Sequence, residues 1–203
     1  IGTNWLMGWS HTSPAADRMI RERHNSKERM FPVLQAFLEH GIDTVMGPSS
    51  QEPALFEAIG YAQEKTGKVM QLVDTPILNV EDSAAGRREA EAAIRQSAQT
   101  GAKLCLIHHS SAEKLVDKQS EQIKRIDDYT KMIRDAGMVP GLSAHMPELV
   151  VYSDMREYDV QTYIQIYNPM GFMMQVEIET VASIINSAKK PVMTIKPMAA
   201  GRC

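Results

Sequence analysis

The chain has 203 residues, of which 43% are hydrophobic and 23% are charged, and its net charge is −3. This balance gives no bulk attraction to nucleic acid or to an anionic membrane, so we expect a small-molecule substrate instead of either partner. No apolar run approaches the roughly 20 residues of a membrane-spanning helix. Cys105 lies inside an apolar run and Cys203 is the last residue. This argues against a disulfide framework and favours a reducing, cytoplasmic setting.

Short apolar runs alternate with helical segments along the whole chain. We expect strands at 1–9, 42–46, 69–73, 104–110, 138–142, 162–167 and 191–195. A first helix starts at Ser13-Pro14, and a second begins or kinks at Pro32. Further helices are expected at about 50–67, 84–100, 120–136, from 147 onwards, and at 176–185. Several of them end in a glycine directly before the next strand, which supports both assignments.

This alternation is typical of a parallel sheet built from βαβ units. The first strand is not followed by a glycine-rich phosphate loop, so a doubly wound open sheet is the less favoured alternative. We therefore predict an α/β fold of the TIM type, a (β/α)8 barrel truncated after the seventh strand. Residues 1–203 would form a single barrel domain that is incomplete at both ends.

Polar residues follow most of the predicted strands, at the edge where parallel sheets bind their ligands. The candidates are Asn4, His11, Ser49, Asp74, His108, His109, Ser143, His145, Asn168 and Lys196. Because neighbouring strand residues point to opposite faces, at most one of His108 and His109 is expected to face the barrel interior. We expect His108, Asp74 and His145 to be the catalytic candidates.

Several of these residues allow two interpretations. Asp74 either faces a ligand or bonds the amides of its own Asp-Thr-Pro turn. Lys196 pairs with a phosphate or, if desolvated, forms a Schiff base. Asp74, His109 and His145 are an alternative ligand set for a divalent metal, although no two of them have a tight ligand spacing.

Four segments of the second half of the chain together resemble the aldo-keto reductase superfamily. They are LCLIHHS at 104–110, AGMVPGLSAHMPE at 136–148, YIQIYNP at 163–169 and PVMTIKPMAAGR at 191–202. The resemblance implies a (β/α)8 barrel that binds a nicotinamide cofactor, usually NADPH. It implies that His108 is an active-site histidine. It also implies cofactor-binding roles for Ser143 and Lys196, and we add Asn168, which ends the sixth strand, to the cofactor-binding candidates.

The sequence departs from that family at three of its four catalytic positions. Met46 stands where the family has an aspartate, no tyrosine follows before Tyr61, and Asp74 stands where the family has a lysine. The first hypothesis is therefore an aldo-keto-reductase-like oxidoreductase that acts on a small carbonyl metabolite with NADP and an unusual proton donor. The second is a non-redox, metal-assisted hydrolase, lyase or isomerase that uses the same residues. The third is a barrel without catalysis that binds a ligand.

Overall fold

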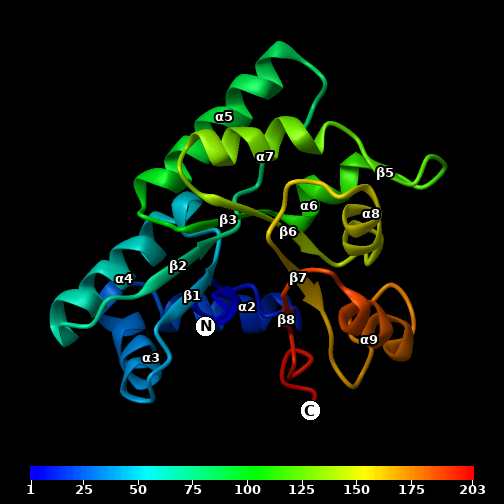
Figure 1. Cartoon of the computed structure of the whole chain (residues 1–203). Helices are drawn as coiled ribbons and strands as arrows, with labels where there is room; N and C mark the ends of the chain where they lie inside the picture. The colour runs from blue at the N-terminus through cyan, green and yellow to red at the C-terminus, as the bar shows by residue number, and fades with distance from the viewer.

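The computed structural model describes all 203 residues as an α/β fold on a curled parallel sheet, a half-barrel (Figure 1). Its strands are β1 (Thr44–Gly47), β2 (Gln71–Asp74), β3 (Leu104–Ile107), β6 (Val139–Ala144), β7 (Thr162–Ile166) and β8 (Val192–Ile195). They lie side by side in chain order, and every neighbouring pair is parallel. Six of the seven predicted strands are thus confirmed, with shifts of one to three residues at most ends.

The predicted first strand at 1–9 is wrong in most of its length. Only Gly2 lies in strand-like register, through one parallel bridge to Met46. Residues Asn4–Met7 form the short helix α1, which ends at Gly8 in the left-handed conformation with a φ of 76°. This turn of helix buries Leu6 and leaves Trp5 and Trp9 at the surface. The apolar run is therefore divided between a buried residue and two exposed ones at the rim.

The longer helices begin and end largely where their capping residues predict. They are α2 (Pro14–Arg23), α3 (Lys27–Glu39), α4 (Pro53–Thr66), α5 (Ala84–Gln99), α7 (Ile126–Asp135), α8 (Glu148–Arg156) and α9 (Ile178–Ser187). The Ser13 hydroxyl accepts the Ala16 N–H at the start of α2, as a capping serine should. The α3 helix begins five residues before Pro32, with Ser26 as its N-cap. Of the two predicted alternatives, a start at Pro32 is therefore wrong, and Pro32 lies inside the helix.

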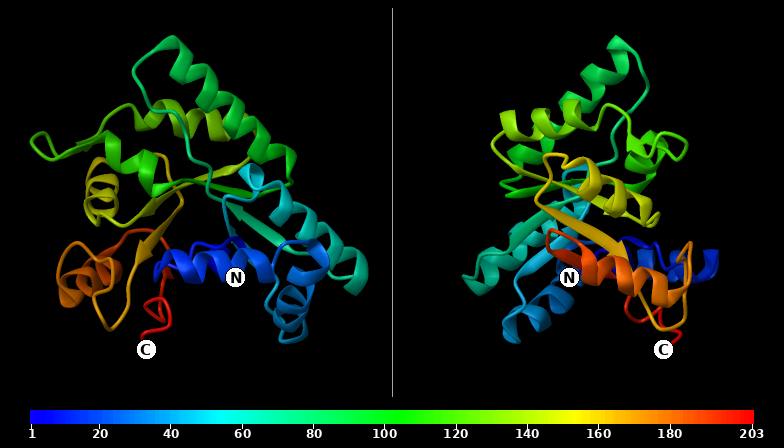
Figure 2. Two further views of the ribbon diagram at one scale, coloured as in Figure 1. Left: turned by 180° about the vertical axis from the view of Figure 1, so that it is seen from behind. Right: turned by 45° about the vertical axis from the view of Figure 1, so that its right-hand side comes forward.

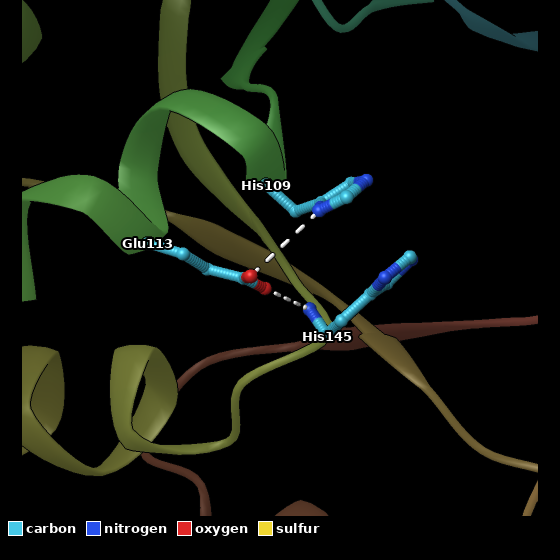
Figure 3. A group of neighbouring side chains, drawn as sticks. All are labelled: His109, Glu113 and His145. Atoms are coloured by element: carbon cyan, nitrogen blue, oxygen red, sulfur yellow. Dashed lines mark hydrogen bonds and ion pairs between the residues drawn. The ribbon is translucent and has the colours of Figure 1, made fainter. Parts of the chain in front are cut away.

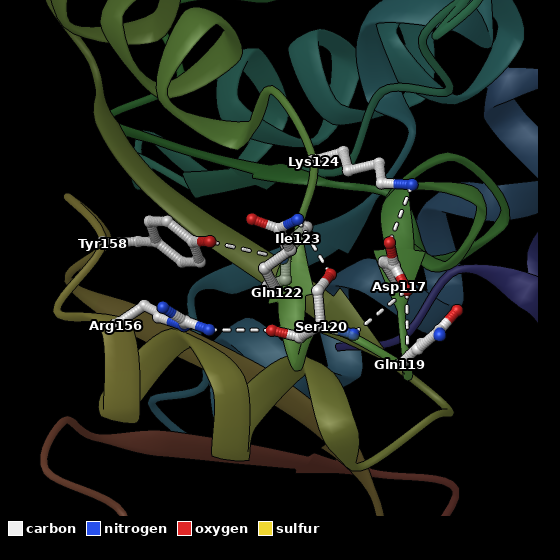
Figure 4. A network of polar contacts seen from close by, with 8 residues as sticks. All are labelled: Asp117, Gln119, Ser120, Gln122, Ile123, Lys124, Arg156 and Tyr158. Carbon is white, nitrogen blue, oxygen red and sulfur yellow. Dashed lines mark hydrogen bonds and ion pairs between the residues drawn. The ribbon is translucent and has the colours of Figure 1, made fainter.

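The segment before α7 forms a hairpin where the sequence pattern predicted helix from residue 120. Short strands β4 (Val116–Asp117) and β5 (Gln122–Ile123) pair antiparallel. The Asp117 carboxylate accepts the N–H groups of Gln119 and Ser120 and pairs with Lys124 (Figure 4). Arg156 on α8 donates to the carbonyl of Ser120. These contacts provide hydrogen-bond partners for the backbone of the turn, so the helix starts only at Ile126.

The two faces of the sheet have different surroundings. Alternate residues such as Val45, Leu72 and Ile107 pack against the helices in the main hydrophobic core. The other alternate residues form a smaller inner cluster of Val73, Leu106 and Ile164, with Met46, Leu104, Met193 and Ile195 packed against it. Figure 2 shows the helices α4, α5 and α7 outside the curled sheet, with α1 and α2 near its other side. The inner face leads to the carboxyl ends of the strands, where the candidate site lies.

None of the helices combines the length and the apolar character that crossing a bilayer requires.

Candidate functional site

A cleft of about 630 Å³ opens at the carboxyl ends of the parallel strands. Its walls come from the N-terminal segment and α1, from the loops after β1, β2, β3 and β6, and from the chain after β8. The lining residues include Asn4, His11, His108, His109, Ser143, His145 and Lys196. The cleft therefore collects seven of the ten polar residues that the sequence pattern singled out.

The charge of this cleft is carried by one side chain. Lys196 is the only Lys, Arg, Asp or Glu among the lining residues. No hydrogen bond or ion pair engages its Nζ, and burial lowers its pKa. Trp5, Trp9, Ile77, Met173 and Met198 add exposed apolar surface to the same cleft. The site is thus largely apolar at its rim, with an unpaired amine inside it.

His108 and His109 both line the cleft, contrary to the expectation that at most one of them faces inward. His108 continues the inward-facing series of Leu104 and Leu106. The chain then turns into the short helix α6 (His109–Ala112), so strand alternation no longer applies to His109. The Nδ1 atom of His108 accepts the Ser110 N–H, which leaves its Nε2 as the protonated nitrogen of the neutral ring.

His109 and His145 lie against each other beside Glu113 (Figure 3). Their rings are stacked with centroids 3.8 Å apart and planes 19° from parallel. Glu113 lies one helical turn after His109, and its Oε2 is 3.8 Å from the His109 Nδ1. The Oε1 atom of Glu113 accepts the N–H groups of His145 and Met146 at 2.8 and 2.9 Å. The carboxylate therefore ties the end of β6 to α6 and faces one imidazole.

The electrostatics of the cleft keep the imidazoles of His108 and His145 neutral at physiological pH. Burial lowers the pKa of His108 to about 4 and that of His145 to about 3, and nearby His109 and Lys196 act in the same direction. The pKa of His11 is also lowered, first by burial and then by Lys196. Although burial opposes ionisation of Glu113, bonds from His109, Met146 and His145 keep its pKa below the usual value. Neutral imidazoles can accept or relay protons at neutral pH.

His11 is held in the cleft by α1. Its Nε2 lies 2.8 Å from the Asn4 Nδ2, which donates to it. His11 itself has a φ of 57°, in the left-handed region that few histidines adopt. The short helix that replaces the predicted strand thus brings Asn4 and His11 to the same wall.

Three predicted site residues lie outside the cleft, and one of them, Ser49, is buried. Asp74 faces the helix layer: it is fully buried, and its Oδ1 accepts the Ser50 N–H at 3.0 Å. Strand alternation explains this, since Val73 already faces inward and Asp74 follows it. Asn168 accepts the N–H groups of Met170 and Phe172 and donates to the carbonyl of Phe172. Its polar atoms therefore stabilise their own loop.

Glu113 is the residue that reasoning from the strand ends missed. The alternative metal set of Asp74, His109 and His145 is not brought together, because Asp74 faces the other side of the sheet. Glu113 takes its place, and the donor atoms of His109, Glu113 and His145 lie within 4.8 Å of one another. The signal was present as a spacing of four between His109 and Glu113, but it becomes visible only once a helix starts at His109.

Neither a scan against protein-family models nor a search of curated proteins gives a match to this chain.

Proposed function

We propose that this chain is a (β/α)8-barrel enzyme that acts on a small anionic carbonyl compound by non-redox acid–base chemistry. The observation that carries the proposal is the composition of the cleft: one unpaired lysine, four histidines and no carboxylate. A cleft with a single positive charge in a desolvated setting attracts anions and rejects cations. Six parallel strands in chain order, with Gly2 beside β1, support the barrel assignment.

The histidines offer distinct roles in such chemistry. The protonated Nε2 of His108 is a hydrogen-bond donor suited to a carbonyl oxygen. Glu113 faces the Nδ1 of His109, which favours a proton there and leaves the opposite nitrogen as a base. Proton transfer next to a polarised carbonyl is the step common to many lyases and isomerases, and the cleft holds both a donor and a base for it.

The proposal is tested by measuring which charges the cleft accepts. Small 2-oxo acids and amines of similar size are titrated into the protein by calorimetry and by thermal shift. We expect saturable binding of oxo acids that weakens at least about tenfold in His108→Asn, and no binding of the amines. Binding of the amines in preference to the acids would overturn it. Binding of the acids without any turnover would favour the non-catalytic ligand-binding barrel.

A divalent metal is the second candidate, because three donor groups converge at His109, Glu113 and His145. Two features count against it. The in-plane lone pairs of stacked rings run side by side, so one ring must rotate before both bind one ion. The Oε1 of Glu113 already accepts two backbone N–H groups. Calorimetric titration with Zn²⁺ and Mn²⁺ tests the site; metal affinity should fall in Glu113→Gln and stay unchanged in Asp74→Asn.

Only some of the residues that the resemblance implies for binding a nicotinamide cofactor line the cleft. Ser143 and Lys196 line the cleft beside His108, which favours the reductase hypothesis. Asn168 is engaged in its own loop, Asp74 faces the helix layer, and Met46 supplies no proton. The residues therefore fit the cofactor poorly, and we derive no step through it. Saturable quenching or enhancement of NADPH fluorescence on titration with the protein would restore this candidate.

A further inference from the structure

The residue after β8 has a backbone that turns its side chain towards the cleft. Met193 and Ile195 belong to the inner cluster, so regular alternation would point residue 196 towards the helix layer. Lys196 instead has a φ of 58° and lines the cleft. A left-handed conformation costs a non-glycine residue about 1 kcal/mol or more, and such strain is concentrated at functional sites.

The surroundings of Lys196 lack everything that normally stabilises an ammonium group. No carboxylate lines the cleft, and no acceptor atom bonds the Nζ. The lysine is nevertheless close enough to lower the pKa of His11, His108 and His145. Burial lowers the pKa of Lys196, so its free amine, which is a nucleophile towards carbonyl carbon, forms more readily than in a solvated lysine.

From this geometry, and resting on the proposed function, we infer that Lys196 forms a Schiff base with a small 2-oxo carboxylate. In this step the Nζ lone pair forms a bond to the carbonyl carbon. The carbonyl oxygen takes up two protons and leaves as water. One ammonium and one ketone thus become one protonated imine and one water, with no oxidant or reductant. The carboxylate next to the imine carbon neutralises its positive charge.

The protonated imine then makes the adjacent carbon acidic. Transfer of a proton from that carbon to an imidazole yields a neutral enamine and an imidazolium, so charge is conserved. His109 is the suited acceptor because Glu113 faces its other nitrogen and stabilises the imidazolium. His108 is suited to hydrogen-bond the departing oxygen. The substrate class is therefore an oxo acid with a hydrogen or a cleavable carbon–carbon bond next to its carbonyl.

Lys190 offers a matched control at the opposite end of the same strand. Burial lowers its pKa as well, but Asp154 and Asp159 oppose that effect, and its Nζ donates to the carbonyl of Tyr158. The two lysines thus share a lowered pKa and differ in having a partner and in lining the cleft.

The test is reduction of the full chain with sodium borohydride in the presence of pyruvate or 2-oxobutyrate, followed by peptide mass spectrometry. We expect a stable adduct at Lys196, with a mass gain equal to the oxo acid minus one oxygen. It should be absent in Lys196→Arg and undiminished in Lys190→Arg. An adduct confined to other lysines, or none at all although the oxo acid binds, would overturn the Schiff base and leave the proposed function standing. Failure of these acids to bind would overturn both.

Discussion

Two hollows of similar volume lie at different parts of the sheet and hold very different charges. One, of about 670 Å³, runs along α4 beside the amino ends of β2 and β3. There Lys27 is 2.7 Å from Glu57, and Glu64 is 3.9 Å from Lys65. The other is the cleft of about 630 Å³ at the carboxyl ends, where Lys196 has no partner.

The difference shows that volume alone does not indicate a functional site. In the first hollow Lys27 pairs with Glu57 within the protein, and this pairing raises the pKa of Lys27. In the cleft, Lys196 is partly buried without an opposite charge beside it, whereas the histidines have Glu113 nearby. A buried polar group without a partner lowers the stability of the fold, and contacts elsewhere have to offset this loss. A ligand that pairs with the group would remove part of the loss.

The largest difference between the two hollows should appear when Lys196 and Lys27 are replaced in turn. Lys196→Met should slow exchange of the pyruvate methyl protons with deuterium oxide, measured by NMR, by about 10³-fold, or roughly 4 kcal/mol in activation free energy. The reason is that enamine formation requires the imine. Lys27→Met should leave the exchange rate unchanged. Equal rates in the two variants would remove the distinction between the hollows.

Asp74 lies at the carboxyl end of β2 but outside the cleft, so its replacement separates an effect on stability from an effect on the reaction in the cleft. Asp74→Ala leaves the buried Ser50 N–H without its acceptor and creates a cavity. We expect the free energy of unfolding in urea to fall by about 2 to 3 kcal/mol. The exchange rate per folded molecule should stay unchanged. As a control, Asp43→Ala removes an exposed carboxylate and should cost less than about 0.5 kcal/mol.

The pH dependence of stability tests the burial of the cleft histidines. With pKa values of about 4 and about 3, His108 and His145 stay neutral in the folded chain while the unfolded chain takes up protons below about pH 6.5. Stability should therefore fall as the pH falls from 6.5 towards 4.5, a range above that of the carboxylates.

Chemical denaturation across that range should show a loss of up to about 2 kcal/mol attributable to His145. The loss should be smaller by that amount in His145→Asn. A wild-type profile that is flat from pH 6.5 to 4.5 would contradict the buried, neutral state.

Replacement of Glu113 should have the smallest of the predicted effects, because Glu113 acts through His109. Glu113→Gln keeps the side-chain shape but removes the charge that favours the imidazolium. We expect the exchange rate, measured in the same NMR assay, to fall about tenfold, near 1.4 kcal/mol. Glu113→Asp should restore part of the rate. An equal loss of rate in Glu113→Asp, which keeps the charge, would indicate a purely structural role.

The sequence pattern predicts the strands of the sheet because buried parallel strands need continuous apolar runs, as at Leu104–Ile107. It fails where a local turn competes with the pattern. At Asn4–Met7 a glycine in the left-handed region ends a helical turn, and at Ser120 the Asp117 carboxylate satisfies a hairpin. Both failures concern segments of only a few residues, where propensity decides little and tertiary contacts decide the outcome.

The sequence by itself determined the order of the six sheet strands and of the longer helices, and the edge of the sheet where the polar residues gather, because periodicity and capping are local properties of the chain. Only the tertiary structure decided which of those residues meet. Asp74 and Lys196 both follow apolar strands, yet pleating turns one towards the helices and a single left-handed residue turns the other into the cleft. Side-chain direction at a strand end depends on one or two backbone angles, which the surrounding packing fixes.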